Sequence, residues 1–331
     1  MAGDTILYLR KRDVARALEG VDVVEAVASA LAAHARRETV LPAEAHLAWQ
    51  HEDETLRSLS MPAVVDGCPG VKIINANPAN PARGLARASG LTLLFDAATG
   101  RPACILDASR ISCLRTAAVT AVATDLLGAR PIERLAVLGT GALARCHLEL
   151  LSKRLPELRE TRLYDVAASR ANALAAAVPG ALVCESAEEA IRGAQLVVAV
   201  TTTTSGYIHH DWLQPGALLV NVSLDDALPE VVLRADKVFV DDWALVAADE
   251  RRLLGRMLRA GDIRGPGSTT AGPRQIDGSL GELLIGTREG RGRPDEIILV
   301  NPFGLAIEDI AVARRVHARA QMLGLGVPLE P

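Results

Sequence analysis

Aromatic residues make up only 3% of this 331-residue sequence. No window holds the roughly 18 uninterrupted apolar residues that a membrane-spanning helix needs. The formal net charge is −4, and the sequence has no sustained run of Lys or Arg. Because nucleic-acid-binding proteins usually carry a basic patch, we expect neither a membrane nor a nucleic acid as a partner.

Cysteine and histidine are also sparse. The five cysteines are odd in number, widely spaced and without a Cys-x-x-Cys pair, which indicates neither a disulfide framework nor a thiolate metal site. The seven histidines do not cluster at metal-ligand spacing, so we expect no metal. Asp4 and the lack of a long apolar core near the N-terminus argue against a signal peptide. We therefore expect a cytoplasmic protein whose cysteines are small, buried apolar residues.

Beyond Pro131, short apolar segments alternate with amphipathic ones. The apolar segments that predict strands are 134–138, 161–164, 182–184, 196–200, 218–222, 237–240 and 297–300. This alternation predicts an α/β fold with a doubly wound parallel sheet of the Rossmann type. The sequence before residue 128 reads differently: a long amphipathic helix is expected from Asp13 to about Arg37, and short runs broken by Pro, Gly and Asn over 41–106 predict an antiparallel sheet.

These patterns divide the chain into two expected domains, as its length also suggests. Residues 1–128 form an α+β substrate-binding domain, which an amphipathic helical stretch in 303–331 completes. Residues 129–302 form the dinucleotide-binding Rossmann domain.

The strongest local signal is the segment Gly-Thr-Gly-Ala-Leu-Ala at 139–144, a G-x-G-x-x-A pattern that follows an apolar strand and precedes a helix. Its glycines allow a tight turn and a close approach of the backbone to a pyrophosphate, whose charge the helix N-terminus binds. We expect five consecutive residues to bind a dinucleotide here, namely Gly139, Thr140, Gly141, Ala142 and Leu143. The alternative is a tight turn between strand and helix with no ligand.

Asp165 follows the next predicted strand, where a carboxylate accepts hydrogen bonds from the ribose hydroxyls of the cofactor and repels a 2′-phosphate. We therefore expect NAD rather than NADP, with Arg170 as the nearby residue that argues most against this preference. The other interpretation of Asp165 is a helix N-cap.

Two basic residues lie in otherwise apolar sequence. Lys72 is flanked by Val71 and Ile73, so its ammonium either points into a cleft or reaches solvent. Arg115 lies near the start of a predicted helix that leads into the nucleotide domain, and it either reaches a ligand crevice or is a surface residue.

The predicted strand 218–222 is followed by Asp225 and Asp226. A carboxylate at the carboxyl end of a parallel strand is well placed for proton transfer beside a nicotinamide, although a capped turn explains the pair equally well. His209 and His210 are more typical of a surface loop.

Several motifs together resemble the ornithine cyclodeaminase and mu-crystallin family. They are Met61-Pro-Ala, Gly70-Val-Lys72, Asn80-Pro-Ala-Arg-Gly-Leu, Leu94-Phe-Asp-Ala-Ala-Thr-Gly-Arg-Pro, Leu114-Arg115-Thr-Ala-Ala and Gly139-Thr-Gly, in order along nearly the whole chain. The resemblance implies that Lys72 and Arg115 bind a substrate carboxylate and that Asp226 handles protons beside the nicotinamide. It also implies a homodimer in which the first domains join their sheets. The remaining expected substrate contacts are Arg57, Arg87, Asn77, Phe303 and Gly304, and the remaining expected cofactor contacts are Arg170, Thr201, Ser223 and Thr116.

Two departures bear on the substrate. Cyclodeaminases carry a further carboxylate-binding arginine where this chain has Glu44. The stretches Arg87-Ala-Ser-Gly, 223–230 and 301–305 instead resemble the branch acting on N-(2-amino-2-carboxyethyl)-L-glutamate, although that branch usually has Arg at the position of Asp225. We therefore expect an NAD-dependent oxidoreductase that takes hydride from the α-carbon of an amino-acid amine, giving an imine that is hydrolysed. The alternatives are a cyclodeaminase, a ketimine reductase, an amino-acid dehydrogenase and a non-catalytic binding protein like mu-crystallin.

Overall fold

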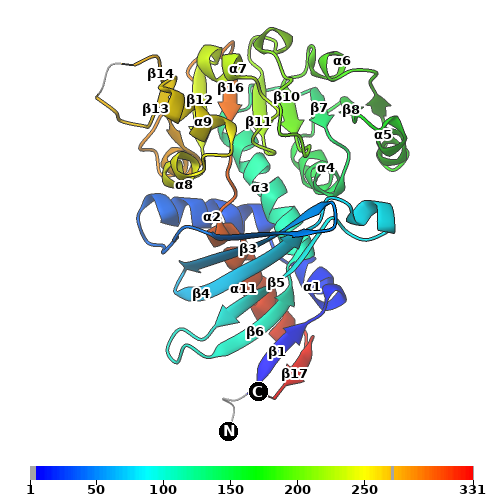
Figure 1. Ribbon diagram of the computed structural model, residues 1–331, viewed down its shortest axis with the longest axis vertical. Coiled ribbons are helices and arrows are strands. Elements are labelled where there is room, and N and C mark those ends of the chain that lie inside the picture. The colour runs from blue at the N-terminus through cyan, green and yellow to red at the C-terminus, as the bar shows by residue number, and fades with distance from the viewer. Residues whose placement is uncertain (1–4, 270–271, 331) are drawn as a thin grey trace. The chain divides into compact units, whose positions relative to one another are not determined.

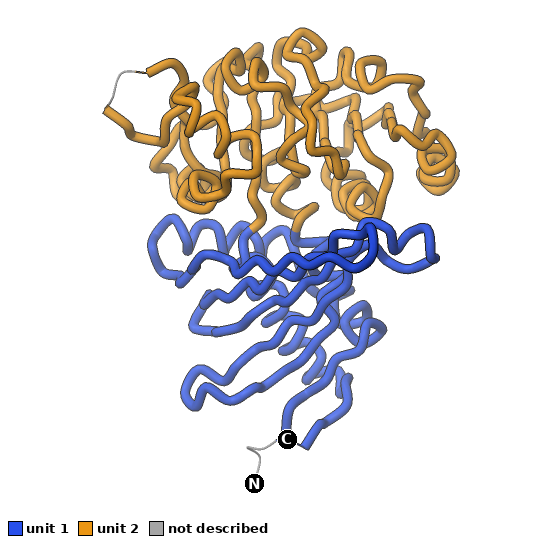
Figure 2. The backbone as a smooth tube through the Cα atoms, viewed as in Figure 1, with its two compact units in different colours: residues 1–115, 305–331 blue, residues 116–304 orange. Residues whose placement is uncertain are grey.

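The computed structural model describes residues 5–269 and 272–330. Asp4, on which the expectation about a signal peptide rests, lies outside the described residues. The chain forms two compact units, one of residues 1–115 and 305–331 and the other of 116–304 (Figure 2). The change between units falls inside the helix α3 (Ser109–Leu127) rather than at its end. The functional division at residues 128 and 302 remains a prediction.

The first unit is built on a seven-stranded sheet in the order β17-β1-β6-β5-β4-β3-β2. Its strands are β1 (Ile6–Leu9), β2 (Ala45–His51), β3 (Glu54–Val65), β4 (Cys68–Ala76), β5 (Ala88–Phe95), β6 (Pro102–Asp107) and β17 (Val327–Leu329). Strands β2 to β6 pair antiparallel, as predicted for 41–106. The helix α11 (Ala306–Met322) packs on β3, β4 and β5, so the C-terminal segment belongs to this unit (Figure 1).

The long helix expected from Asp13 to about Arg37 is in fact two helices, α1 (Lys11–Leu18) and α2 (Val23–Ala35). The side chain of Asp22 accepts a hydrogen bond from the backbone N–H of Glu25 and so begins α2 as its N-cap. The expectation of one helix was wrong because apolar spacing continues through the break while the cap ends the helical backbone. A short 3-10 turn, η1 (Asn80–Arg83), follows β4.

The second unit holds an eight-stranded sheet in the order β15-β12-β16-β11-β10-β7-β8-β9, and every pairing in it is parallel. Its strands are β7 (Arg134–Leu138), β8 (Glu160–Tyr164), β9 (Ala181–Val183), β10 (Leu196–Ala199), β11 (Leu218–Asn221), β12 (Lys237–Val240), β15 (Gly278–Ser279) and β16 (Ile298–Val300), beside a separate pair, β13 (Ile263–Arg264) and β14 (Arg274–Gln275). The connecting elements are α4 (Ala142–Arg154), α5 (Ala168–Ala175), α6 (Ala187–Ile191), η2 (His210–Trp212), α7 (Pro229–Arg234), α8 (Trp243–Ala248), α9 (Leu253–Ala260) and α10 (Leu280–Leu284). The predicted doubly wound parallel sheet is confirmed. The strand order reverses between β7 and β10, which is where such sheets bind ligands at the carboxyl ends of their strands.

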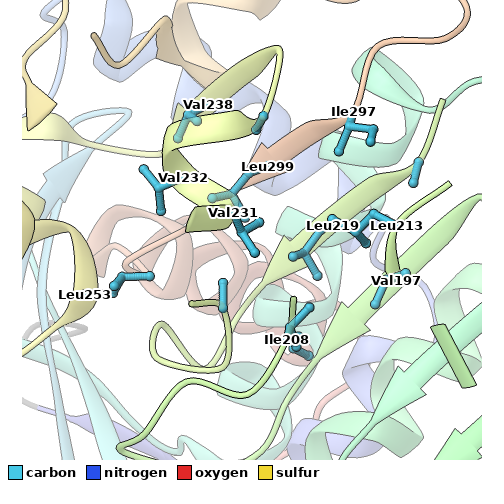
Figure 3. Packing of buried hydrophobic residues seen from close by; sticks show 14 of the residues in the cluster. Val197, Ile208, Leu213, Leu219, Val231, Val232, Val238, Leu253, Ile297 and Leu299 are labelled. Carbon is cyan, nitrogen blue, oxygen red and sulfur yellow. The ribbon is translucent and has the colours of Figure 1, made fainter. Parts of the chain in front are cut away.

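The core of this unit explains why its strands read as continuous apolar runs. Val197, Leu219 and Leu299 come from three neighbouring strands and pack with Val231 of α7 and Leu253 of α9 (Figure 3). Parallel strands covered on both faces bury both sets of side chains, so no polar alternation survives in the sequence. This rigid core fixes the strand ends from which the polar groups project.

The cysteines agree only in part with expectation. Cys68, Cys104 and Cys184 are free, and two of them are buried. Cys113 and Cys146 are disulfide-bonded, so the expectation of no disulfide was wrong. A disulfide requires a close approach of two Cα atoms, which the spacing of cysteines in a sequence does not reveal. Within residues 5–269 and 272–330, no helix is both long enough and apolar enough to cross a membrane.

Candidate active site

The glycine turn lies between β7 and α4, as the motif predicts. Gly139 has a φ of 86°, and a Cβ there would come within 2.9 Å of the carbonyl oxygen of Val200, so only glycine fits. Gly141 is the N-cap of α4; it offers no side-chain cap, and the first turn holds no acidic residue. The helix therefore presents its positive end without a competing carboxylate of its own, which suits a bound anion.

Asp165, directly after β8, is held against this turn. Its Oδ2 accepts hydrogen bonds from the backbone N–H and the hydroxyl of Thr140, both at 2.9 Å, and its Oδ1 accepts one from the N–H of Ala167 at 2.9 Å. Ala167, not Asp165, is the N-cap of α5, so the N-cap interpretation was wrong. Arg170 is exposed in the first turn of α5. The carboxylate thus connects the glycine turn to the second strand, the position at which a ribose is bound in this fold.

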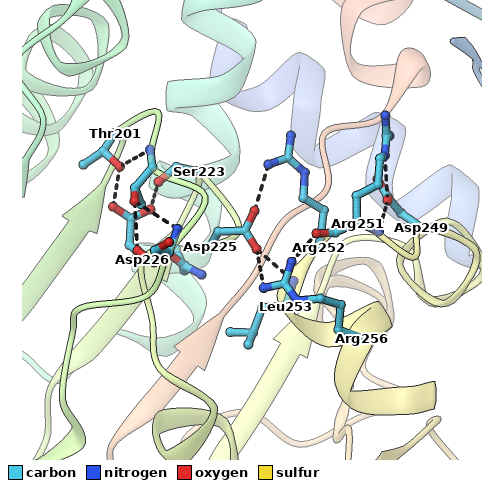
Figure 4. Close-up of polar contacts among 12 residues, drawn as sticks. Thr201, Ser223, Asp225, Asp226, Asp249, Arg251, Arg252, Leu253 and Arg256 are labelled. Carbon is cyan, nitrogen blue, oxygen red and sulfur yellow. Dashed lines mark hydrogen bonds and ion pairs between the residues drawn. The ribbon is translucent and has the colours of Figure 1, made fainter. Parts of the chain in front are cut away.

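Asp226 lies in the turn after β11, fully buried. Its Oδ1 accepts a hydrogen bond from the Tyr207 hydroxyl at 3.0 Å. The same atom accepts one from the Thr201 hydroxyl at 2.6 Å, and Ser223 donates to Oδ2 (Figure 4). Burial raises the pKa of Asp226 above its usual value, although the three hydroxyl groups oppose this by stabilising the anion. A buried carboxylate that hydroxyl groups hold in place is suited to accept and return a proton.

Asp225 points the opposite way and has a different environment (Figure 4). Its carboxylate binds Arg252 at 2.9 Å and Arg256 at 3.1 Å, and accepts the backbone N–H of Leu253 at 3.0 Å. It therefore anchors the first turn of α9. Leu224, just before this pair, has a φ of 75°, an unfavourable conformation for a branched residue. Sequence reasoning selected Asp226 but missed Tyr207, Arg252 and Arg256, which no local pattern marks.

Two more strand ends carry buried polar groups. Asn221, the last residue of β11, donates from Nδ2 to Oδ1 of Asn301 at 2.7 Å. The buried Asp241 accepts the backbone N–H groups of Phe303 and Gly304, at 2.8 and 2.6 Å. The backbone of the two predicted substrate contacts Phe303 and Gly304 is thus held in place by a carboxylate.

The first unit holds a buried cluster of four charged groups. Lys72 of β4 donates to Asp309 at 2.5 Å, while Arg115 of α3 binds Glu308 at 2.8 Å and Asp309 at 3.2 Å. All four are buried, with relative exposures of 7% or less. Lys72 therefore does not reach bulk solvent and Arg115 is not a surface residue. Burial and the neighbouring Arg115 lower the pKa of Lys72 to about 8, while Asp309 and Glu308 oppose this.

The acids Glu308 and Asp309 were missed by sequence reasoning. They occupy the first turn of α11, where acidic residues are common for helix-dipole reasons alone. Their burial could be read only from the packing of α11 on β3 to β5.

Asn77, Arg57 and Arg87 are the other predicted substrate contacts in the first unit. Asn77 donates to Glu54 at 2.7 Å and accepts the N–H of Ala79 at 2.8 Å, so it shapes the loop after β4. Arg57 is half-buried on the same sheet face as Lys72, as the alternation along β3 and its pairing with β4 require. Arg87 is also half-buried, and burial lowers its pKa.

Thr116 is half-buried in α3. His209 is exposed and pairs with Glu230 at 3.0 Å, as expected for a surface loop. The side chain of His210 is only 14% exposed, so the same expectation was wrong for His210. Among the residues that the structure describes, no group of three or more His, Cys, Asp or Glu is arranged to hold a metal ion.

Comparisons with known proteins agree with this geometry. Residues 7–323 match the model of the ornithine cyclodeaminase/mu-crystallin family. The N-((2S)-2-amino-2-carboxyethyl)-L-glutamate dehydrogenase of Staphylococcus aureus is 32% identical over 341 residues, covering 98% of each chain. The crystal structure of CmnK is 38% identical, with a TM-score of 0.90 over 99% of this chain and 98% of that one. An archaeal alanine dehydrogenase dimer with bound NAD is 25% identical, with a TM-score of 0.83 over 98% and 99% of the two chains. This chain belongs to the ornithine cyclodeaminase/mu-crystallin family.

Proposed function

We propose that this protein is an NAD-dependent oxidoreductase that removes hydride from the α-carbon of an amino-acid amine and releases the resulting imine by hydrolysis. The observation that carries the proposal is Asp226: a buried carboxylate, held by three hydroxyl groups, at the strand ends of a dinucleotide-binding sheet. A protein that only binds a ligand has no need of such a proton-transfer group.

The residues around the glycine turn fit NAD. The turn leaves open space beside Gly141 for a pyrophosphate, and Asp165 stands where the adenosine ribose lies in this fold. Thr201 and Ser223, which follow β10 and β11, are proposed to contact the nicotinamide. Thr140, Ala142, Leu143, Arg170 and Thr116 complete the proposed cofactor contacts. The nicotinamide supplies the hydride acceptor when it is bound.

Asp226 handles the protons of the reaction. An ammonium or protonated secondary amine must lose a proton before its α-carbon can release hydride, and Asp226 accepts that proton. Hydride departure leaves an iminium, and Asp226 then assists the water that attacks its carbon. The hydroxyl groups of Thr201, Tyr207 and Ser223 orient the carboxylate and stabilise its ionised form, to which Asp226 returns by releasing the first proton to solvent before it accepts a proton from the attacking water.

Lys72 and Arg115 are proposed to bind the substrate carboxylate, Arg115 with its planar paired donors and Lys72 as a compact charge. Arg57, Arg87, Asn77, Phe303 and Gly304 are proposed as further substrate contacts.

We propose N-(2-amino-2-carboxyethyl)-L-glutamate as the substrate. The Staphylococcus aureus relative named for this compound matches along the whole chain. Oxidation of its secondary amine by NAD⁺ and addition of one water give 2,3-diaminopropionate, 2-oxoglutarate, NADH and a proton. Glu44 in place of an arginine argues against cyclodeamination. The Arg expected at the position of Asp225 is replaced by an acid, but that acid recruits Arg252 and Arg256 to the same turn.

The test is to incubate the purified protein and NAD⁺ with this amine, follow NADH formation and identify the products by mass. Net NADH with 2,3-diaminopropionate and 2-oxoglutarate supports the proposal. Lys72→Ala and Arg115→Ala should impair turnover while leaving the affinity for NAD⁺ nearly intact. Conversion of ornithine to proline and ammonia without net NADH would instead identify a cyclodeaminase.

We also propose a homodimer joined through the first unit. Leu47, Trp49, Ile73 and Leu91 are exposed on the sheet face opposite the one that α11 covers. An uncovered apolar patch of this kind is typical of an association surface, and the neighbour with bound NAD is a dimer. A cytoplasmic location remains part of this proposal, to be checked by cell fractionation.

A further inference from the structure

Asp309, which binds Lys72, and Thr92, which is paired with Lys72 across the sheet, each hold a buried polar atom without a hydrogen-bond partner among the described residues. Oδ1 of Asp309 and the hydroxyl oxygen of Thr92 make no hydrogen bond within the part of the chain that the structure describes. Both residues are completely buried. Buried polar atoms are nearly always satisfied in folded proteins, so such atoms call for a ligand or a water.

These two atoms belong to the same place as Lys72 and Arg115. Thr92 of β5 is directly opposite Lys72 in the β4–β5 ladder, so the two side chains lie on one sheet face. Asp309 contacts both cations through its other oxygen, Oδ2. The unpartnered carboxylate oxygen therefore belongs to the residue that contacts both cations, and the Thr92 hydroxyl lies on the same sheet face as Lys72.

The charges in this cluster also balance. Lys72 and Arg115 contribute two positive charges, and Glu308 and Asp309 contribute two negative ones. A simple carboxylate entering the cluster would leave one uncompensated negative charge in a buried place, which is unfavourable. An amino acid brings an ammonium with its carboxylate and adds no net charge.

We propose that Asp309 and Thr92 form an ammonium-binding position beside the Lys72–Arg115 carboxylate clamp, so that this site selects amino acids over simple carboxylates. The inference rests on the proposed function, because it assumes that the clamp binds a substrate carboxylate. Asp309 Oδ1 accepts one ammonium N–H and the Thr92 hydroxyl accepts a second. For the proposed substrate, the group bound is a primary ammonium next to a carboxylate.

The test uses L-alanine and propionate, which share a carbon skeleton and differ by the ammonium. Their affinities are measured by calorimetry on the protein with NADH, where no turnover occurs. The wild-type protein should prefer L-alanine by at least about 10-fold, since a site built for a donor rejects an analogue that lacks it.

Asp309→Asn and Thr92→Val should each bring this ratio toward one. Asp309→Asn should also bind propionate more tightly, because the cluster then carries a net positive charge. Thr92→Val preserves shape and removes an unsatisfied hydroxyl, so it should fold at least as stably and still lose the preference. The matched control is Asp66→Asn. It removes the exposed ion pair between Asp66 and Arg314, which lies on α11 like Asp309, and it should leave both affinities unchanged.

No preference in the wild-type protein, or an unchanged ratio in Asp309→Asn and Thr92→Val, would overturn the inference. Lys72→Ala separates this failure from that of the proposed function. If Lys72→Ala lowers the affinity for both ligands while Asp309→Asn and Thr92→Val leave the affinity ratio unchanged, only the ammonium position is refuted. If Lys72→Ala weakens neither, the carboxylate clamp itself is refuted.

Discussion

The adjacent residues Asp225 and Asp226 provide a matched pair of variants with opposite expected effects. In Asp226→Asn the Oδ1 atom can still accept the hydroxyls of Thr201 and Tyr207, so the local shape is retained and the negative charge is lost. An amide cannot accept the substrate proton. We expect kcat to fall by about 10²–10⁴-fold, the usual contribution of a general base.

The same substitution should not destabilise the fold. Burial raises the pKa of Asp226, which means that the ionised carboxylate is less favourable in the folded protein than in the unfolded chain. A neutral amide removes this cost, so the melting temperature of Asp226→Asn should equal or exceed that of the wild type.

Asp225→Asn should behave in the reverse way. It removes the charge that Arg252 and Arg256 share, and these side chains remain 26% and 46% exposed, so water compensates part of the loss. We expect a cost of about 1–3 kcal/mol. For a domain of about 150–250 residues, the size range of the unit 116–304, that cost lowers the melting temperature by roughly 2–4 °C per kcal/mol. Turnover should change far less than in Asp226→Asn.

The assay combines steady-state turnover, thermal unfolding and NAD⁺ affinity on both purified variants. A severe loss of kcat in Asp225→Asn with normal stability would refute the assignment. So would normal turnover by Asp226→Asn while NAD⁺ and substrate still bind.

Four further predictions concern pH, cofactor and assembly. Lys72 must be charged to bind a carboxylate, and its pKa is about 8, so kcat/KM should fall as the pH rises through about 8. Lys72→Arg should move this alkaline limb of the pH profile to higher pH. An alkaline limb that does not move would contradict the role of Lys72 in carboxylate binding. Asp226 must be deprotonated to act as a base and its pKa is raised, so the acid limb of the same profile should lie above the usual range of an aspartate. Titration of both cofactors should show tighter binding of NAD than NADP, and Asp165→Ala with a neighbouring arginine should reverse the order; tighter NADP binding by the wild type would refute this role of Asp165. Trp49→Glu places a charge on the exposed sheet face and should give a monomer in light scattering, whereas an unchanged mass would exclude this face as the interface.

Much of the cofactor half of the site could be predicted because its signals are local. The positive φ of the turn favours glycine at Gly139, and the strand before it and the helix after it are adjacent in sequence. The position of Asp165 follows from the same unit. The parallel sheet could be predicted equally well from the sequence, because strands that are buried on both faces are continuous apolar runs.

Helix ends and disulfides were less predictable. The break between α1 and α2 depends on one capping side chain, Asp22, inside a region whose apolar spacing continues. The bonding state of Cys113 and Cys146 depends on distances in the folded chain rather than on their spacing.

The fold class, the glycine turn and the residue types that carry the chemistry could be predicted from the amino-acid sequence, since each of these depends mainly on neighbours within a few positions. How those residues are paired depends on the folded chain. Asp309 reaches Lys72 across 237 positions and Glu308 reaches Arg115 across 193, and Asp225 and Asp226 differ because separate distant groups surround them. The physical reason is that the charge state and role of a buried polar group are set by the groups packed around it, and those come together only when distant elements fold onto one another.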